Sequence, residues 1–191
     1  MEQMQRVISK IMDCQRCRLW KDAKNAVPGE GSLNTPLLFV GEGPGYWEDI
    51  KGRPFVGKAG EQLDDLLSDI DLNRDEVYIT NVVKHRPPNN RDPKQDEIDL
   101  CTPYLEEQIK IIKPKLIITL GRHSTKLLLS KIDIKVTGIT KIRGKIFEGE
   151  LYGLRIKIMP TFHPAAVLYN PSYISALKDD FKHIRSELNK T

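Results

Sequence analysis

The stretch Leu37-Leu38-Phe39-Val40-Gly41-Glu42-Gly43-Pro44-Gly45 joins a short apolar run to a glycine-rich loop that holds a single carboxylate. Apolar runs of this length are typical of strands that are buried on both faces, as in a parallel sheet. Three further runs, rich in β-branched residues, occupy positions 77–83, 116–120 and 156–159. The sequence therefore predicts a sheet built from such buried strands.

Helical patterns fill the sequence between these runs, at residues 61–70, 94–112 and 124–129. In the last part of the chain, apolar residues recur three and four positions apart, at Ile174, Leu177, Phe181, Ile184 and Leu188. The glycine-containing segment 134–150 is predicted to form a β-ribbon or an irregular insertion. Alternating strands and helices indicate a layered α/β domain. Because 191 residues suit one compact unit, we expect residues 1–191 to form a single domain.

The composition excludes several classes of protein. Hydrophobic residues make up 39% of the chain and charged residues 29%, which argues against disorder, collagen-like repeats and a coiled coil. No apolar run approaches the ~20 residues that a membrane span needs. The N-terminal residues 1–13 alternate polar and apolar types and do not resemble a secretory signal. We therefore expect a soluble, cytoplasmic protein with no membrane partner.

The charge is distributed unevenly along the chain. The formal net charge of +4 combines 30 basic and 26 acidic residues. Residues 1–108 hold 14 basic and 20 acidic side chains, whereas residues 109–191 hold 16 basic and 6 acidic ones. A net +10 in the second part suggests a polyanionic partner such as nucleic acid, contacted mostly by residues after 108. An ordinary lysine-rich surface is the alternative.

Unusual polar residues follow the predicted strands. Glu42 follows the first run, Asn81 lies within the second, Arg122 and His123 follow the third, and His163 follows the fourth. In open parallel sheets, ligands bind beyond the carboxyl ends of the strands, where these loops converge. The sequence therefore predicts one site that contains these side chains.

The chemistry of this site is open at the level of single residues. The loop around Glu42 has neither the Lys-Ser/Thr ending of a P-loop nor the G-x-G-x-x-G spacing, which disfavours nucleotide-phosphate binding. A tight turn with a surface carboxylate is the alternative. The Asn81 amide in an apolar strand matches the donor–acceptor edge of a pyrimidine, or is satisfied by nearby backbone. Phe55, in a glycine-bracketed loop, either stacks on a flat base or packs in the core.

Three cysteines suggest a metal site rather than a disulfide framework. Cys14 and Cys17 form a C-x-x-C pair, Cys101 lies far downstream, and His85 precedes Cys101 by sixteen residues. Together these residues make a Cys3His set, which by ligand chemistry alone favours structural zinc. Iron–sulfur clusters usually have four cysteines, although histidine ligation exists. A thiol redox role for the C-x-x-C pair is weaker, because the pair precedes the first strand.

Four motifs considered together point to a family: Gly41-Glu42-Gly43-Pro44-Gly45, Gly52-Arg53-Pro54-Phe55-Val56-Gly57, Thr80-Asn81-Val82-Val83-Lys84 and His163-Pro164-Ala165. Their order and spacing resemble the family 4 uracil-DNA glycosylases, the iron–sulfur branch of that superfamily. The similarity runs from Cys14 to the C-terminal helix. It implies a three-layer α/β fold with a central parallel sheet flanked by helices. It also implies base-excision repair, in which uracil is flipped out of DNA and its N-glycosidic bond is hydrolysed.

The resemblance also implies a [4Fe-4S] cluster, with one departure from the family pattern. The family usually has cysteine where this chain has His85, in a segment that reads K-C-R-P-P. Three outcomes are open: His85 ligates the cluster together with Cys14, Cys17 and Cys101, the cluster is held by the three cysteines and is labile, or the site holds zinc. The first is our expectation, with a structural role for the cluster.

Several roles in uracil binding follow from the same resemblance. Phe55 is expected to stack on the uracil face, and Asn81 to read the O4/N3 edge, which rejects cytosine. Backbone amides of Gly41 and Gly43 are expected to bind uracil oxygens. His163 is expected to donate a hydrogen bond to uracil O2 and to stabilise the leaving anion.

Glu42 and two neighbours have further implied roles. Glu42 is expected either to orient or deprotonate the water or to stabilise the sugar cation. Thymine differs from uracil by one methyl group, so a side chain must crowd C5. Glu48 is our first choice for this residue and Tyr46 the second.

DNA contacts are predicted in three places. Lys141, Arg143 and Lys145 surround a glycine and suit phosphates, and Arg122 and His123 lie at an expected helix start. In the segment 166–170, Leu168 and Tyr169 are expected to enter the base stack left by the extruded uracil, with simple packing as the alternative.

The expected partner is uracil-containing DNA, and the protein is expected to be a monomer. Two alternative functions remain open for the chain. The chain could act on other damaged bases, or it could be a nucleic-acid-binding iron–sulfur or zinc protein without catalysis. The combination of Glu42, Asn81 and His163 favours catalysis over binding alone.

Overall fold

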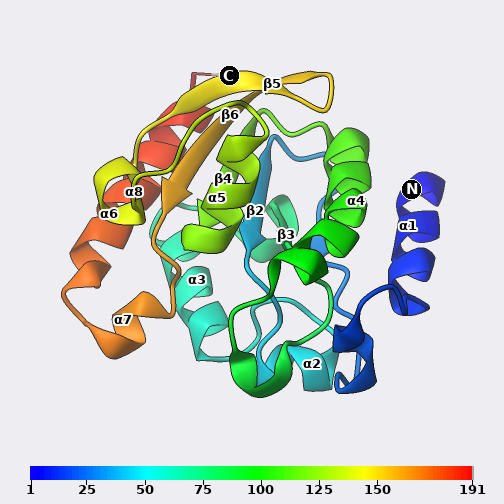
Figure 1. The fold of residues 1–191 in the computed structure, drawn as a ribbon. Coiled ribbons are helices and arrows are strands. Elements are labelled where there is room, and N and C mark those ends of the chain that lie inside the picture. The colour runs from blue at the N-terminus through cyan, green and yellow to red at the C-terminus, as the bar shows by residue number, and fades with distance from the viewer. Residues whose placement is uncertain (191) are drawn as a thin grey trace.

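The computed structural model describes residues 1–190 and has a six-stranded sheet at its centre, in the order β1-β3-β2-β4-β6-β5 (Figure 1). The strands are β1 (Glu30–Gly31), β2 (Leu37–Gly41), β3 (Tyr78–Asn81), β4 (Leu116–Leu120), β5 (Phe147–Leu151) and β6 (Leu154–Thr161). The strands β3, β2, β4 and β6 pair in parallel, which confirms the predicted parallel centre.

The two edge strands are antiparallel, so the sheet as a whole is mixed. Tyr152 and Gly153 separate β5 from β6, with φ angles of 54° and 80°. A two-residue loop with two positive φ angles reverses the chain at once, so β5 must run antiparallel to β6. The segment predicted as a ribbon or insertion therefore supplies this edge strand and one short helix.

Eight α-helices and three short 3₁₀ turns in residues 1–190 surround the sheet. The α-helices are α1 (Glu2–Met12), α2 (Tyr46–Lys51), α3 (Lys58–Ser68), α4 (Gln95–Ile112), α5 (Arg122–Ser130), α6 (Ile139–Ile142), α7 (Ala166–Tyr169) and α8 (Tyr173–Leu188). The 3₁₀ turns are η1 (Arg18–Lys21), η2 (Arg74–Glu76) and η3 (Pro88–Asn90). The predicted helices correspond to α3, α4, α5 and α8. The helix α1 was not predicted, although its buried residues Met4, Val7 and Ile11 have helical spacing.

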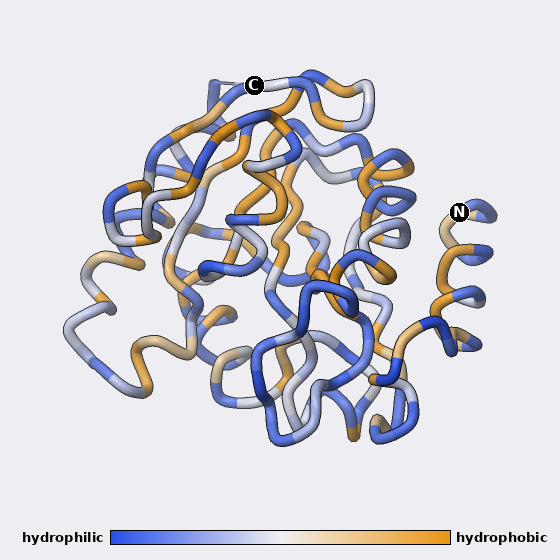
Figure 2. The backbone as a smooth tube through the Cα atoms, in the orientation of Figure 1, coloured by the Kyte–Doolittle hydropathy of each residue, from blue (hydrophilic) through white to orange (hydrophobic). Residues whose placement is uncertain are grey.

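The sheet separates two hydrophobic cores. In β2, Leu38 and Val40 belong to the core that includes buried residues of α1, α4 and α5, whereas Leu37 and Phe39 belong to the core that includes those of α3 and α8. Successive strand residues point to opposite faces, which explains this alternation. Figure 2 shows the hydrophobic residues concentrated along the central strands. The result is a three-layer α/β/α arrangement.

The parallel strands all end at the lower edge of the sheet in Figure 1, next to α2 and α7. Gly41 at the end of β2 pairs with Asn81 at the end of β3, and Leu120 of β4 pairs with Thr161 of β6. The loops that follow these residues therefore share one edge. None of the helices in residues 1–190 is both long and apolar enough to cross a bilayer.

Candidate active site

A pocket of about 570 Å³ lies beyond this edge of the sheet. Its walls include Glu42, Phe55, Asn81 and His163, which come from separate loops and strand ends. Three of the four polar strand ends predicted to converge, those with Glu42, Asn81 and His163, thus meet in one cavity. Arg122 and His123, from the fourth, do not line it.

Asn81 brings an unsatisfied acceptor to the pocket. Its side chain is 1% exposed, and its Oδ1 has no hydrogen-bond partner among the described residues. Buried polar atoms are almost always paired, so an orphaned amide oxygen in a pocket wall marks a position for a ligand donor. A Cβ atom on Gly41 would lie 2.3 Å from this Oδ1 and 2.6 Å from Phe55 Cζ. Only glycine at position 41 leaves room for both side chains.

Phe55 is held in a strained backbone conformation at the pocket wall. Its φ angle is 50°, a left-handed value that is costly for a residue with a side chain. The Nη1 of Arg74 donates to the Phe55 carbonyl oxygen at 2.9 Å, and the Glu48 carboxylate accepts from the amides of Val56 and Gly57 at 2.8 and 2.9 Å. These contacts fix the loop. The Phe55 ring lies 5.5 Å from the imidazole of His163, at an interplanar angle of 25°.

The protonation of His163 follows from its surroundings. Burial lowers the pKa of this imidazole to about 4, so the ring is neutral at physiological pH. The backbone N–H of Ala165 donates to Nδ1 at 3.1 Å. Since Nδ1 accepts, the proton of the neutral ring lies on Nε2, and that atom is a hydrogen-bond donor.

Glu42 lies beside a small charged cluster. Burial raises the pKa of its carboxyl group above 4.5, and nearby His123 opposes this effect. The His123 Nε2 lies 3.6 Å from Glu42 Oε2 and 3.3 Å from Asp92 Oδ2, and Arg122 also binds Asp92. Arg122 and His123 therefore have a protein partner beside the pocket, but the Arg122 side chain is still 68% exposed, and contact of these two residues with DNA stays a prediction. No pattern in the sequence pointed to Asp92, which reaches this cluster from the loop after η3.

Glu48 and Tyr46, the two candidates for thymine exclusion, both line the pocket. The Glu48 carboxylate is bound by backbone amides, including that of Gly45 at 3.1 Å. This carboxylate therefore stabilises the start of α2 and the loop that contains Phe55. Tyr46 is half-exposed at the mouth. Exclusion of thymine by either residue stays a prediction.

The basic residues predicted to bind phosphates divide into two groups. Lys141 and Lys145 are exposed and stay candidates. For Arg143 the prediction is wrong, because its guanidinium binds the buried carboxylate of Asp180. The Nε donates to Oδ2 at 2.9 Å and the Nη2 donates to Oδ1 at 2.6 Å. An arginine that neutralises a buried carboxylate is not free for DNA.

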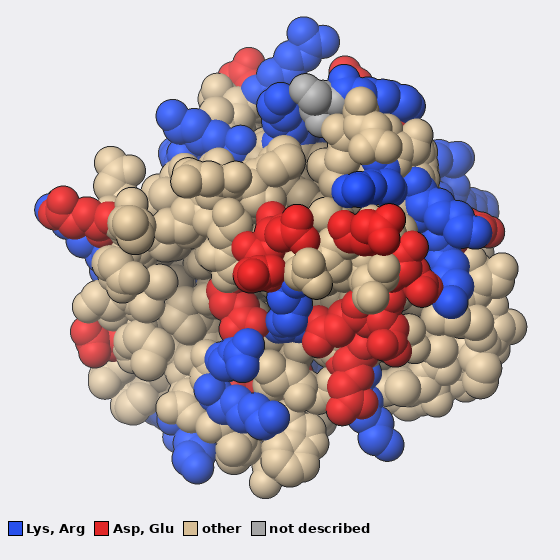
Figure 3. Space-filling view, turned by 180° about the vertical axis from the view of Figure 1, so that it is seen from behind, with Lys and Arg blue, Asp and Glu red and all other residues tan. Residues whose placement is uncertain are grey.

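The net positive charge of residues 109–191 is not gathered at the pocket. Arg155 and Lys157 lie near the amino end of β6, at the opposite end of the strand from His163. Figure 3 shows carboxylates gathered at the centre of the face turned away from the viewer in Figure 1. That face is poorly suited to a polyanion.

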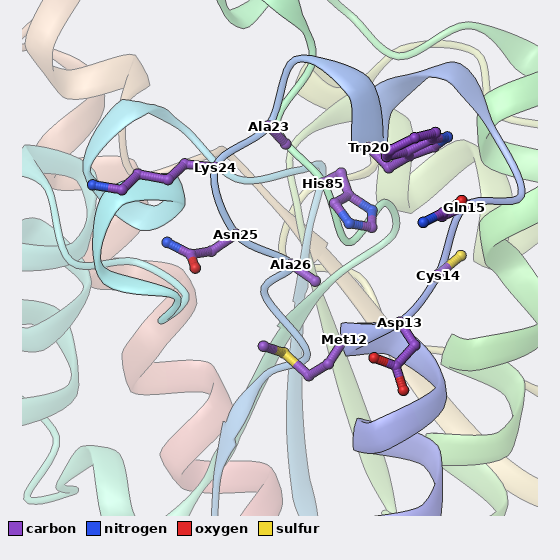
Figure 4. A pocket seen from close by; sticks show the side chains of 10 residues that line it. All are labelled: Met12, Asp13, Cys14, Gln15, Trp20, Ala23, Lys24, Asn25, Ala26 and His85. Carbon is purple, nitrogen blue, oxygen red and sulfur yellow. The ribbon is translucent and has the colours of Figure 1, made fainter.

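The three cysteines lie near one another, with Cys14 and Cys17 in the segment after α1 and Cys101 on α4. Cys14 and Cys17 are half-buried and Cys101 is buried. Burial raises the pKa of the Cys101 thiol to about 11, and the charges of the other two thiols add to this effect. The backbone N–H of Lys84 donates to Cys101 Sγ at 3.3 Å. His85 and Cys14 line a second pocket, of about 300 Å³ (Figure 4).

The spacing of these donors bears on the kind of metal group. Within residues 1–190, no three of the donor atoms of Cys14, Cys17, His85 and Cys101 all lie within 4.8 Å of one another. Ligands of a single tetrahedral zinc lie about 3.8 Å apart, given Zn–S bonds of about 2.3 Å. These donors therefore do not form a ready-made single-ion site as they stand, and the [4Fe-4S] cluster and zinc both stay predictions. Burial also lowers the pKa of His85, so its imidazole is available as a neutral ligand.

Lys84 connects the cysteines to the pocket and was not predicted as a site residue. Its Nζ is fully buried and donates to the Asn81 carbonyl oxygen at 2.7 Å, to Thr80 Oγ1 at 2.7 Å and to Gln108 Oε1 at 2.8 Å. The backbone N–H of the same residue contacts Cys101. One residue thus fixes the strand end of Asn81 against the cysteine cluster.

Comparison with known proteins agrees with this geometry. Residues 28–189 match the Uracil DNA glycosylase superfamily. A Type-4 uracil-DNA glycosylase of Saccharolobus solfataricus is 50% identical over 190 residues, which cover 99% of this chain and 88% of that protein. Type-4 uracil-DNA glycosylases of Sulfurisphaera tokodaii and Thermotoga maritima are 51% and 45% identical, over 97% and 90% of this chain and 84% and 86% of theirs. The chain therefore belongs to the uracil DNA glycosylase superfamily, in the branch of the type-4 enzymes.

Proposed function

We propose that this protein is a DNA-repair enzyme that extrudes uracil from DNA and hydrolyses its N-glycosidic bond, leaving free uracil and an abasic site. The observation that carries the proposal is the unpartnered amide oxygen of Asn81 in the same pocket as Glu42 and His163. A labelled oligonucleotide with one uracil tests it, with matched thymine and cytosine oligonucleotides as controls. We expect abasic product from the uracil strand only. Absence of product with metal-replete protein would overturn the proposal.

Recognition of uracil would use the amide of Asn81 and the ring of Phe55. A base must leave the duplex before a pocket of this kind can hold it. Asn81 Oδ1 would accept from uracil N3–H, the Asn81 amino group would donate to O4, and Phe55 would stack on the base. Cytosine has the reverse pattern of donor and acceptor at this edge, so both groups of the amide would stay unpaired. Backbone amides of Gly41 and Gly43 would bind further uracil oxygens.

The reaction would break the bond between C1′ of the deoxyribose and N1 of uracil. The bonding electron pair leaves on uracil, whose O2 accepts a hydrogen bond from His163 Nε2–H. The sugar gains positive charge in the transition state, and the Glu42 carboxylate stabilises it and orients the attacking water. The water oxygen bonds to C1′, its proton passes to Glu42 and then to solvent, and the uracil anion takes a proton from solvent.

The pH dependence distinguishes the two catalytic groups. The carboxylate is the active form of Glu42, and burial raises the pKa of this group from its usual 4.5. Activity should therefore be present above the raised pKa and should be lost as the pH falls through it. His163 is neutral until the pH falls to about 4. We therefore expect the acid limb of kcat/KM to report Glu42.

The residual activity of Glu42→Gln provides the check for this assignment. Its acid limb should move down toward pH 4, where His163 takes up a proton. An acid limb at the same pH in this variant and in the unchanged protein would contradict the assignment.

We also propose a [4Fe-4S] cluster held by Cys14, Cys17, Cys101 and His85, with structural zinc as the alternative. The three thiols near one another support it, and so does the neutral imidazole of His85, which lines a pocket with Cys14. Held by these residues, the cluster would have a structural role and no part in hydrolysis, since Cys14 and Cys17 follow α1, Cys101 lies on α4 and His85 lies in the loop after β3. We also propose that the protein is a monomer, in which a single chain supplies Glu42, Asn81 and His163 to one pocket.

Replacing His85 tests the ligand set. We expect His85→Ala to lose iron and visible absorption, and His85→Cys to retain both, since cysteine is also an iron ligand. His183→Ala is the matched control, because His183 lies in α8 and bonds the Gly144 carbonyl oxygen at 2.8 Å. Full iron content and unchanged absorption in His85→Ala would exclude the histidine as a ligand. A colourless protein that contains zinc would exclude the cluster.

A further inference from the structure

The mouth of the active-site pocket gathers most of the large hydrophobic side chains that are exposed among residues 1–190. Six large hydrophobic residues among the described ones are exposed, and four of these line this pocket. They are Tyr46 (50% exposed), Trp47 (54%), Leu168 (50%) and Tyr169 (89%). The first two begin α2 and the last two end α7. Exposed apolar groups concentrated around one cavity mark an interaction surface.

The two aromatic rings on α2 are held in place before any ligand binds. The Tyr46 and Trp47 rings meet edge to face, with centroids 5.2 Å apart and an interplanar angle of 80°. The Arg86 guanidinium lies 5.1 Å from the centre of the Tyr46 ring, and its Nε donates to Asn90 Oδ1 at 2.7 Å. A Cβ atom on Gly57 would lie 3.3 Å from Trp47 Cδ1, so the indole packs closely on that loop.

We propose that Trp47, supported by Tyr46, is a stacking platform for the base next to the extruded uracil in the same DNA strand. The inference rests on the proposed function and adds a second nucleotide subsite to it. When uracil leaves the stack, its neighbour loses a stacking partner and exposes an aromatic face. An exposed indole beside the pocket can take over that contact, because every base has a π-face. Leu168 and Tyr169 line the same pocket from a different helix, α7.

Charge at the same rim favours a nucleic acid over a protein as the occupant. Lys58 is exposed, lines the pocket and makes no ion pair with the described residues. Arg86 lies directly beside Tyr46. Aromatic rings interleaved with cations suit a strand of DNA, whose bases stack while its phosphates are neutralised. The platform is continuous with the pocket that would hold the uracil of that strand.

A cycle of protein and substrate changes tests the platform. The substrates are single-stranded uracil oligonucleotides in which the base on the 5′ side, the 3′ side or neither side of uracil is replaced by a stable abasic analogue. The proteins are the unchanged enzyme, Trp47→Ala and Trp47→Phe, and kcat/KM is measured for each combination. Trp47 is on the surface, and circular dichroism checks that the variants are folded. Glu150→Gln is the control, because Glu150 is exposed in β5 and is not among the residues that line the pocket.

We expect removal of one neighbouring base to lower kcat/KM of the unchanged enzyme by about 5- to 100-fold, the usual strength of base–aromatic stacking. Trp47→Ala should show a similar loss with the intact strand and no further loss when that base is absent. Trp47→Phe should restore most of the activity. The platform would be overturned if the loss of kcat/KM caused by Trp47→Ala and the loss caused by the missing base multiplied in the combined experiment. It would also be overturned if Trp47→Phe had a kcat/KM as low as that of Trp47→Ala.

A fluorescence measurement separates this proposal from the proposed function. The chain has two tryptophans, so Trp20→Phe leaves Trp47 as the only tryptophan, and excitation at the red edge of the absorption band selects it over the tyrosines. We expect quenching by single-stranded product DNA that contains an abasic site, and none when the neighbouring base is also missing. This readout needs no catalysis. Quenching without uracil release would reject the function and keep the platform, whereas uracil release without any neighbour-dependent quenching would reject the platform alone.

Discussion

Glu42→Gln is expected to lower kcat for uracil release by about 10²–10⁴-fold, the usual loss when one positioned acid–base group is removed. Glutamine keeps the shape of the side chain but cannot accept a proton from water or offset positive charge on the sugar. Affinity for DNA should change little, because the carboxyl group is half-buried beside His123 and does not form the DNA-facing rim. Single-turnover kinetics and binding to abasic DNA measure the two effects separately.

Glu150→Gln is the matched control for this variant. Glu150 lies exposed in β5 and does not line the pocket, so its replacement should leave kcat unchanged. Turnover of Glu42→Gln at the level of the control would remove Glu42 from the mechanism. Weak binding with normal turnover would instead give Glu42 a role in holding DNA.

Asn81→Leu is expected to separate activity from stability. Leucine has a similar shape but neither donor nor acceptor, so two hydrogen bonds to uracil disappear and kcat/KM should fall by at least about 100-fold. In the folded protein, no group of residues 1–190 pairs with Asn81 Oδ1. An unmade buried hydrogen bond costs about 1–3 kcal/mol, so the free energy of unfolding should stay the same or rise.

Thermal unfolding and inhibition by free uracil provide the measurements for Asn81→Leu. The variant should keep or raise Tm and should lose sensitivity to free uracil. Asn189→Leu, at the exposed end of α8, is the control and should alter neither property. A large drop in Tm with Asn81→Leu would mean that Asn81 stabilises the fold and that its amide is not reserved for a ligand.

The sequence predicted the parallel strands and the convergence of Glu42, Asn81 and His163. Both predictions rest on topology, since the carboxyl ends of parallel strands must share one edge of a sheet. The β5 edge was harder to predict, because its direction depends on the two-residue turn at Tyr152 and Gly153. The family resemblance supplied the roles of these residues, and the chemistry of single side chains had left them open.

Long-range contacts of side chains could not be predicted. Arg143 looked suited to phosphate in its basic segment, but Asp180 in α8 binds it. Arg122 and His123 looked free at a helix start, but Asp92 lies against both. These pairings depend on how separate loops and helices pack, and periodicity along the chain carries no information about that. Trp47 was missed for the same reason, because only the folded chain shows that its ring is exposed at the pocket.

The most direct test of the central claim is to count the products of one uracil-containing strand. We predict one free uracil for each abasic site, released by water, with the strand intact until alkali cleaves it. Thymine and cytosine strands should yield no free base. Release of no uracil by metal-replete protein, or a strand broken before alkali is added, would contradict hydrolysis by the pocket of Glu42, Asn81 and His163.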